Sequence, residues 1–296
     1  MNALISVIVT TYNREDALDV VLRSLAAQKD RNFEVVVADD GSSPATAAVV
    51  SQWKSRLGVS VSHVWHEHHG FRAAEIRNHA IRESSGEYVI FLDGDCLVRP
   101  DFVAAHRKLA QHGWFVTGNR ALLTPRLTAT ILNTALEPEH WGFSRWFVQR
   151  LTGGLNRLAP VLRLPLGTLR KMRPKVWQDA RSCNLAVWRS DLDRVDGFDA
   201  SFSGWGKEDS DLLVRLLHAG VRRKDGAFAT GVIHLWHPDA DRSQLPANQK
   251  KLEAMIESSR VRAERGMSTA GAATTRIAGS NGFVSPAKDA PSAPRE

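Results

Sequence analysis

The sequence predicts an α/β fold in which strands and helices alternate around a mostly parallel central sheet. Short apolar runs rich in β-branched residues alternate with segments whose apolar residues recur at helical spacing. Such alternation builds right-handed βαβ units and therefore a parallel sheet. Two of the runs end in acidic residues, Asp39-Asp40 and Asp93-Gly94-Asp95. Because parallel strands place their carboxyl ends along one edge, we expect these carboxylates to converge there.

The first part of the chain contains four predicted strands and four predicted helices. The strands are expected at 4–9, 33–38, 59–65 and 87–92. Asn13 can cap the first helix, because acidic residues follow it and suit the positive end of the helix. The other helices are expected at 44–56, 72–84 and 100–111.

The pattern loosens over 121–178, which holds five prolines and is interpreted as short helices and loops laid over the sheet. Further along, 182–188 and 232–238 are predicted strands, 208–220 is a predicted helix, and 243–265 suits an amphipathic helix. The expected organisation is one domain over 1–240, a terminal helix within 241–266, and a disordered tail over 267–296, where apolar residues are scarce.

Composition and charge narrow the class of protein. The hydrophobic content of 43% suffices for a core. Cys96 and Cys183 cannot form a disulfide framework and show no metal-site spacing, which fits a reducing compartment. The chain enters its first strand within a few residues, and no apolar stretch reaches the length of a membrane span. We therefore expect a cytoplasmic protein.

The net charge of +7 is concentrated in one segment. No acidic residue occurs from His140 to Gln178, where eight basic residues fall: Arg145, Arg150, Arg157, Arg163, Arg170, Lys171, Arg173 and Lys175. Aromatic residues and leucines are interspersed among them. This pattern is typical of an ordinary solvated surface, but also of a segment that rests on an anionic membrane. Nucleic acid or a phosphorylated acceptor would attract the same charge.

Each candidate site residue has a simpler structural explanation when taken alone. Asp93-Gly94-Asp95 could be a solvated turn. Acidic residues in the first turn of the 208–220 helix favour its dipole by roughly 0.3–1 kcal/mol each. His234 and His237 could be ordinary surface or core residues. Together, acidic strand ends and a histidine pair indicate a metal site instead.

Several segments occur in an order and at separations that, taken together, are highly specific. They are 7–14, 37–42, 70–78, 93–95, 197–199 and 205–209. In this set the chain resembles family 2 glycosyltransferases with the GT-A fold, a single Rossmann-like nucleotide-binding domain, from Ile5 to about Pro238. The Trp205–Asp209 segment also resembles the galactosyl- and N-acetylgalactosaminyltransferase branch, including chondroitin-polymerase-like domains.

The resemblance implies a nucleotide pocket at the first two strand ends. Thr11, Tyr12 and Arg14 match the loop that lines this pocket. Asp40 matches the acid that contacts uracil, and Arg77 matches a basic residue beside the nucleotide.

The resemblance also assigns the D-x-D motif. Asp93 matches the acid on the ribose or phosphate side, Gly94 lies between the two acids, and Asp95 matches the metal ligand. A histidine completes the metal site in related enzymes; His234 fits best and His237 second. Mn²⁺ or Mg²⁺ is the expected metal.

The remaining roles fall at the start of the 208–220 helix. Glu208 matches an acid that binds the acceptor or donor sugar, and Asp209 matches the general base of inverting members. Trp205 offers a flat face of the kind on which sugar rings stack.

The expected function is therefore inverting, metal-dependent transfer of a sugar from a UDP-sugar to a saccharide or lipid-linked saccharide acceptor. Galactose or N-acetylgalactosamine is favoured, and glucose or N-acetylglucosamine is the alternative. Surface polysaccharide or lipopolysaccharide biosynthesis at the inner face of the plasma membrane is the expected setting. An anionic membrane could contact 145–175. No nucleic-acid partner is expected.

Two other functions are weighed against it. A sugar nucleotidyltransferase also uses an α/β sheet with acidic residues, but usually needs a glycine-rich phosphate loop after the first strand. This chain has Thr10-Thr11-Tyr12-Asn13-Arg14 at that place. A non-catalytic membrane- or nucleic-acid-binding protein would explain the basic segment but not the set of acidic residues.

Overall fold

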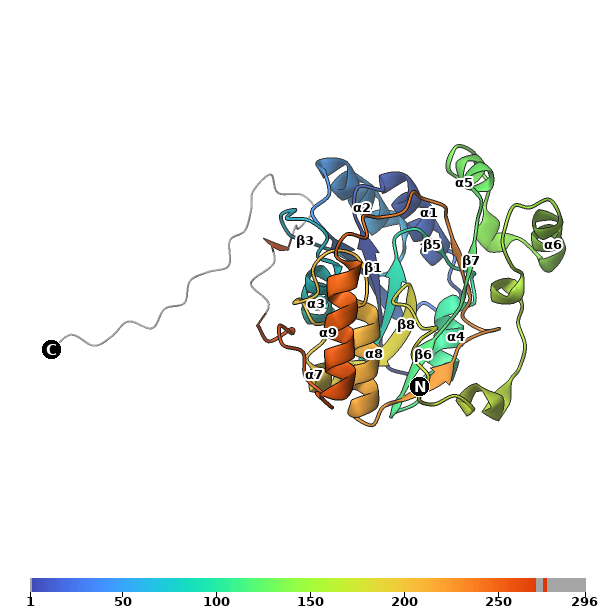
Figure 1. Cartoon of the computed structure of the whole chain (residues 1–296). Coiled ribbons are helices and arrows are strands. Elements are labelled where there is room, and N and C mark those ends of the chain that lie inside the picture. The colour runs from blue at the N-terminus through green and yellow to red at the C-terminus, as the bar shows by residue number, and fades with distance from the viewer. Residues whose placement is uncertain (1, 270–273, 276–296) are drawn as a thin grey trace.

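The computed structural model describes residues 2–269 and 274–275, which form a main sheet with helices on both faces (Figure 1). Within this part of the chain the strands of the main sheet lie in the order β11-β3-β2-β1-β4-β8-β6-β9. Their bounds are β1 Ile5–Thr11, β2 Phe33–Asp39, β3 Val61–Trp65, β4 Tyr88–Asp93, β6 Trp114–Thr117, β8 Asn184–Trp188, β9 Arg222–Asp225 and β11 Thr274–Thr275. The sheet is mostly parallel, as predicted, but β8 runs antiparallel between β4 and β6, and β11 runs antiparallel to β3.

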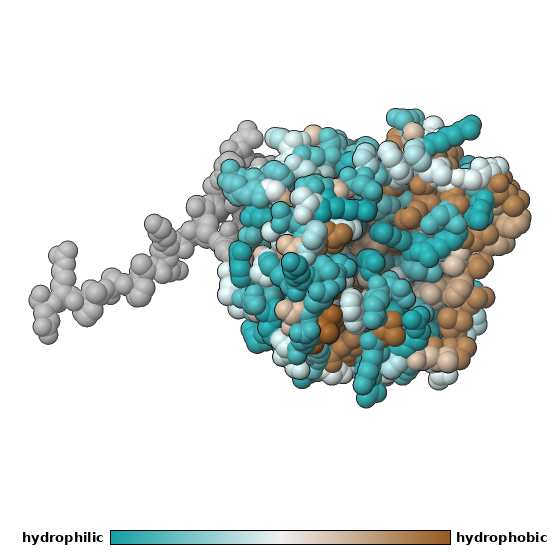
Figure 2. Space-filling model, viewed as in Figure 1, coloured by the Kyte–Doolittle hydropathy of each residue, from teal (hydrophilic) through white to brown (hydrophobic). Residues whose placement is uncertain are grey.

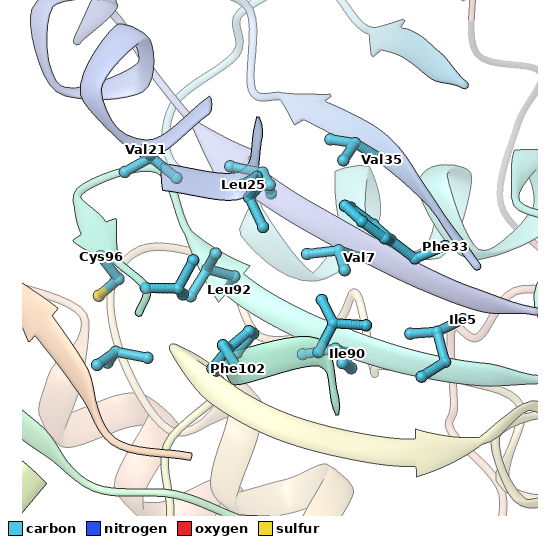
Figure 3. Close-up of a cluster of buried hydrophobic side chains, with 14 of the residues drawn as sticks. Ile5, Val7, Val21, Leu25, Phe33, Val35, Ile90, Leu92, Cys96 and Phe102 are labelled. Atoms are coloured by element: carbon cyan, nitrogen blue, oxygen red, sulfur yellow. The ribbon is translucent and has the colours of Figure 1, made fainter. Parts of the chain in front are cut away.

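The helices divide between the two faces of this sheet. α1 Glu15–Ala26, α2 Pro44–Arg56 and α4 Phe102–Leu109 cover one face; α3 Ala73–Glu83, α7 Arg189–Val195 and α8 Glu208–His218 cover the other. α9 Leu245–Glu257 packs on α8. Successive residues of a strand point to opposite faces, so Val7 joins the first cluster and Ile8 the second. Figure 3 shows Val7, Val21 and Leu25 among the side chains that fill the space between β1 and α1.

A second, three-stranded sheet lies beside the main one. It consists of β5 Cys96–Leu97, β7 Arg120–Leu122 and β10 Val232–His234, in the order β5-β10-β7. The expected strand over 232–238 is therefore shorter, and it ends at the first histidine. β5 directly follows Asp95, so this small sheet brings the D-G-D turn next to the histidines.

The 121–178 segment consists largely of short helices and loops, as predicted. Most of it covers the small sheet, but its last 3₁₀ helix, at 167–171, lies against β9 of the main sheet. Its elements are α5 Pro125–Leu132, α6 Phe143–Leu151 and the 3₁₀ helices η1 Pro138–His140, η2 Ala159–Val161 and η3 Gly167–Lys171. Trp141 and Trp146 pack in one buried cluster with Ile233 and Leu235, which flank His234. α5 and α6 lie at the right of Figure 1, with α5 against α1 and α6 farther out.

Three further expectations differ at segment ends. Asn13 does not cap α1: it has a positive φ of 44°, and its Oδ1 accepts a hydrogen bond from Ser43 N in the neighbouring loop. The helix expected over 243–265 covers only Leu245–Glu257. The expected disordered tail begins with residues that contact the domain, because Met267 is buried and Ser268 bonds to Asp196. The rest of 267–296, apart from 269 and 274–275, lies outside the described residues.

Candidate active site

A pocket of about 860 Å³ lies at the carboxyl ends of β1, β2 and β4. This is the edge at which open α/β sheets bind ligands. Its lining includes most of the predicted site residues: Thr11, Tyr12, Arg14, Asp40, Arg77, Asp93, Gly94, Asp95, Trp205, Glu208, Asp209 and His237. The structure thus brings together residues more than two hundred positions apart in the sequence, from Thr11 to His237. Asp39 is not among them, because its carboxylate is buried and bonds to His63.

One side of the pocket is built by the loops after β1 and β2. The carboxylate of Asp40 lies 2.6 Å from Nε2 of His66 and accepts a hydrogen bond of 2.9 Å from Arg72 N. Tyr12 is exposed, and its ring stacks on that of His68 at 4.6 Å. The hydroxyl of Thr11 is buried and has no hydrogen-bond partner among the described residues. This side therefore offers an acid, a flat aromatic surface and an unused hydroxyl.

Arg77 lies between two carboxylates on the floor of the pocket. Its guanidinium lies 3.0 Å from Glu208 and 3.3 Å from Asp93, and its Nε donates to the Thr10 hydroxyl at 3.1 Å. Arg77 and Glu208 are buried, with side-chain exposures of 5% and 10%. We call Arg77, Asp93 and Glu208 the arginine cluster. The three nitrogen atoms of the Arg77 guanidinium all donate to protein groups.

Burial and neighbouring charges shift the pKa values of this cluster. Burial raises the pKa of Asp93 to about 6; Asp95 adds to the rise, while Arg77 opposes it. The pKa of Glu208 is also raised, because burial and Asp209 disfavour the charged form more than Arg77 favours it. Burial would lower the pKa of Arg77, but the two carboxylates outweigh this and raise it. The arginine therefore stays charged and binds both acidic side chains.

Gly94 allows the two acids to sit against β1. Its N–H donates to Thr10 O at 2.7 Å, and a Cβ at this position would lie 2.9 Å from that same oxygen. No side chain fits there without moving backbone. The glycine thus separates the acids in function: Asp93 faces Arg77, and Asp95 faces the histidines.

Asp95 and the two histidines form a compact group. The Oδ2 atom of Asp95 lies 3.2 Å from Nε2 of His237 and 3.6 Å from Nε2 of His234. Among the described residues these three side chains offer ligand atoms that all lie within 4.8 Å of one another. We call them the histidine corner. His234 lies beside the pocket lining, and both predicted histidines are present in the corner.

The donor set of this corner fits a divalent cation. Nδ1 of His237 lies 2.7 Å from Pro238 O and donates to it, so Nε2 is the ring nitrogen that faces Asp95. Burial lowers the pKa of His234, although Asp95 opposes the shift, which keeps this ring neutral near pH 7. Two imidazoles facing a carboxylate oxygen are the arrangement that metal sites use.

The start of α8 forms the opposite wall. Lys207 precedes the helix with a positive φ of 80°, and Gly206 has a φ of 105°, which favours glycine. Asp209 accepts hydrogen bonds from the backbone N–H groups of Ser210 at 2.7 Å and Ser182 at 3.4 Å. No arginine or lysine pairs with Asp209 in the described part of the chain. Its carboxylate therefore lines the pocket and is held by neutral donors only, among the described residues.

Two other side chains near this wall have different surroundings from Asp209. The third acid of the first turn, Asp211, is fully buried and forms an ion pair of 2.7 Å with Arg215. It stabilises the helix and does not face the pocket. The guanidinium of Arg242 lies 5.0 Å from the ring of Trp205, so a cation already covers one face of the tryptophan.

Sequence reasoning missed several residues that line the pocket: Phe71, Arg120, Trp177, Arg181 and Arg242. Arg120 lies on β7 and Arg181 just before β8, in segments with weak periodicity. The one sequence signal for Arg120 and Arg181 was that they lie in the later part of the chain, which carries the excess of positive charge. Their charges make the pocket suited to an anionic ligand such as a diphosphate.

An α/β sheet with acidic strand ends, a D-G-D turn and a Glu-Asp helix start around one pocket defines a glycosyltransferase of the GT-A type. Residues 6–151 match the family model described as "Glycosyl transferase family 2", and residues 168–237 match "N-terminal domain of galactosyltransferase". By these matches the chain is a glycosyltransferase, and residues 6–151 are of family 2.

Curated relatives agree on this class. The chain is 34% identical over 231 residues to validoxylamine A glucosyltransferase of Streptomyces hygroscopicus subsp. limoneus, covering 74% of this chain and 49% of that protein. It is 27% identical over 249 residues to chondroitin synthase of Escherichia coli, covering 76% of this chain and 34% of that protein. The chain thus spans about half the length, or less, of these relatives.

Solved structures agree on the fold. S. aureus TarS 1-349 superposes with a TM-score of 0.55 at 19% identity, covering 86% of this chain and 65% of that one. The mannosyltransferase PcManGT of Pyrobaculum calidifontis, solved with GDP-Man and Mn²⁺, gives a TM-score of 0.53 at 19% identity, covering 87% and 73%. Among the described residues, none of the helices has the length and apolar character needed to cross a bilayer.

Proposed function

We propose that this enzyme moves a sugar from a UDP-sugar to a saccharide acceptor with inversion at the anomeric carbon, using a divalent cation. The observation that carries the proposal is the single pocket in which the arginine cluster, the histidine corner and Asp209 all meet. These groups supply, in turn, donor positioning, a cation site and a base.

The nucleotide is assigned to the β1–β2 side of the pocket. Asp40 is held by His66 and a backbone N–H so that it faces this side, where it can accept from the uracil ring. Thr11, Tyr12 and Arg14 line the same region. Structures of TarS with UDP and with UDP-GlcNAc support a uridine nucleotide.

The donor sugar is assigned to galactose or N-acetylgalactosamine first. The match of residues 168–237 to a galactosyltransferase domain supports this choice. Glucose and N-acetylglucosamine follow, as the names of the glucosyltransferase and TarS relatives suggest. Trp205 and Glu208 lie in the pocket where the sugar would rest.

Arg77 acts in this proposal as a positioning residue. It fixes Asp93 and Glu208 by contacts of 3.3 and 3.0 Å, so that each carboxylate has a free oxygen for ligand hydroxyls. Gly94 sets Asp93 and Asp95 on separate sides of the turn.

Asp95, His237 and His234 would hold the cation. Two imidazoles with one carboxylate suit Mn²⁺ better than Mg²⁺, which prefers oxygen ligands. When bound, a divalent cation neutralises charge that develops on the departing diphosphate. The Mn²⁺ in the PcManGT structure supports a cation in this fold.

Asp209 is the proposed base. It lines the pocket without a cationic partner among the described residues, so its carboxylate can take the proton of the acceptor hydroxyl as the new bond forms. One such carboxylate suffices for direct displacement with inversion.

The acceptor is proposed to be a saccharide or lipid-linked saccharide in surface polysaccharide or lipopolysaccharide assembly, at the cytoplasmic face of the plasma membrane. The chondroitin synthase relatives support a polysaccharide product.

A panel of nucleotide sugars tests the proposal. Purified protein with Mn²⁺ is scored for protection from thermal unfolding and for slow donor hydrolysis. We expect UDP-galactose or UDP-N-acetylgalactosamine to protect best, and chelation of the metal to weaken the protection. Preference for a GDP-sugar would contradict the uridine assignment, and a retained anomeric configuration in the product would contradict inversion.

A further inference from the structure

Helix α6 presents an apolar surface to solvent. Its outward side chains Phe143, Phe147, Val148 and Leu151 are 49%, 43%, 52% and 70% exposed, while Trp146 on the opposite side is fully buried. A surface helix of a globular domain usually shows the reverse pattern, with its outer face polar. The exposed apolar face therefore calls for an explanation other than folding of this domain.

The apolar exposure continues along the chain after α6. Leu164, Leu169 and Met172 are 45%, 59% and 73% exposed. Of the twelve large hydrophobic residues found exposed in the described part of the chain, seven lie in 143–172. Figure 2 shows hydrophobic residues along the right-hand edge of the molecule, where Figure 1 places α6. We call this region the α6 surface.

Arginines flank the apolar face of α6. At 100° per residue, Arg145 and Arg150 fall on opposite sides of the stripe formed by Phe147, Leu151 and Val148. The guanidinium of Arg145 lies 4.0 Å from the ring of Trp141, and Arg150 forms no ion pair within the described residues. No acidic residue occurs between His140 and Gln178. The surface is thus complementary to a negative partner.

Two other basic residues of the segment, Arg163 and Arg170, hold the fold together, whereas Arg157, Arg173 and Lys175 are exposed. Arg170 is buried and donates to the carbonyl oxygens of Asp225 and Ala227 at 2.8 and 2.6 Å. Arg163 pairs with Asp101 at 2.7 Å. We therefore centre the proposal on α6, where exposed apolar residues and exposed arginines share one helix, and Leu164, Leu169 and Met172 follow it in the chain.

We propose that the α6 surface rests in the headgroup region of an anionic membrane. Phe147, Val148 and Leu151 would insert at the boundary of the acyl chains, and Arg145 and Arg150 would contact lipid phosphates. A convex apolar stripe with cations on both edges is the pattern of an interfacial helix, and anionic lipid supplies the missing negative charge. This inference is independent of sugar transfer, because binding to lipid needs neither donor nor acceptor.

Vesicle flotation with the full chain tests the proposal. Vesicles of phosphatidylcholine mixed with phosphatidylglycerol are compared with phosphatidylcholine alone, in the absence of nucleotide sugar and metal. We expect binding to the mixed vesicles only. The double variant Phe147→Ser/Leu151→Ser should lower the partition coefficient by about tenfold or more. Arg150→Gln should lower it by about fivefold.

Matched variants on other surfaces serve as controls. Ile256→Ser on α9 removes an apolar residue that is 40% exposed, and Arg56→Gln removes an exposed arginine of α2. Both should bind vesicles like the wild type, and all variants should keep its thermal unfolding midpoint. Equal binding by Phe147→Ser/Leu151→Ser and wild type would overturn the proposal. So would a wild-type dimer that ignores vesicles and that this variant dissociates, since the surface would then join two copies.

Discussion

The arginine cluster and the histidine corner begin two residues apart, at Asp93 and Asp95, yet they have opposite electrostatic character. In the cluster, Arg77 lies within 3.3 Å of both Asp93 and Glu208 and offsets part of their negative charge. In the corner, Asp95 faces two histidines and no arginine or lysine among the described residues pairs with it. The acids of the arginine cluster thus have a positive partner within the protein. The carboxylate of Asp95 would gain one only when a cation binds in the histidine corner.

Asp209, like Asp95, has no arginine partner among the described residues. Glu208, like Asp93, pairs with Arg77, although Glu208 and Asp209 are adjacent in sequence. Glu208 pairs with Arg77, and Asp209 accepts only from backbone N–H groups and from Ser210 in the described structure. Acidic residues with a buried arginine partner therefore position the site, and those without one remain for chemistry. Each prediction below tests this division.

The largest effect is expected at the unpaired carboxylate. Asp209→Asn should lower sugar transfer by roughly 10²–10⁴-fold, because the amide cannot accept the proton of the acceptor hydroxyl. UDP should still protect the variant from thermal unfolding. Turnover with saturating donor and acceptor measures the loss, and Asp193→Asn on the exposed side of α7 should leave it unchanged. Near-normal turnover of Asp209→Asn would show that Asp209 is not the general base.

Breaking the arginine cluster should affect stability first. Arg77→Met should lower the free energy of unfolding by about 3 kcal/mol, because it leaves buried carboxylates without a countercharge. Adding Glu208→Gln should recover part of this loss. Urea unfolding measures both. The control is Arg14→Met: its ion pair with Asp16 has a similar distance, 2.9 Å, but exposures of 30% and 50%, so its loss should be within about 1 kcal/mol. An equal effect at the two arginines would contradict the comparison.

Opening the histidine corner should affect metal binding without unfolding the protein. His237→Ala should weaken Mn²⁺ affinity at least as much as the roughly 10–100-fold that loss of an outer-shell partner costs. Calorimetric titration with Mn²⁺ alone measures this. His140→Ala, at an exposed histidine of η1, is the matched control. If Arg77→Met reduced Mn²⁺ affinity more than His237→Ala did, the two regions would not be separate.

The smallest effect is expected at the glycine that separates the two regions. Gly94→Ala should cost about 1–3 kcal/mol of stability, because its Cβ would meet the Thr10 carbonyl at 2.9 Å and the turn must shift. Gly142→Ala should cost less, since a Cβ there has no atom within 4 Å. Comparing the thermal unfolding midpoints of the two variants measures this difference in stability. A harmless Gly94→Ala would show that the turn does not depend on this close approach.

The parallel half of the sheet could be predicted because each strand carries a local signal. The runs of β1, β2 and β4 are apolar and β-branched, and their acidic ends mark the edge that binds ligands. The direction of β8 could not be predicted, since an apolar run has the same composition in either orientation. The strands of the small sheet have two or three residues, too few for a periodic signal.

The candidate site shows the same limit at the level of side chains. The resemblance gathered Arg77 and Glu208 at one pocket, but their pairing joins residues 131 positions apart, which no local pattern encodes. The strand was expected to run to Pro238, yet it ends at His234, and the chain then turns so that His237 also faces Asp95. Arg120 and Arg181 carry no local signal, because single arginines in weakly periodic segments are usually solvated.

The buried cluster beneath α6 has a consequence for which acceptors can be reached. Trp146 shares that cluster with Ile233 and Leu235, on either side of His234, so the packing links α6 to the histidine corner. With α6 seated on a lipid layer, the height of the reaction centre above that layer would be fixed. The enzyme would then elongate only those lipid-anchored chains whose growing end lies at that height above the lipid layer.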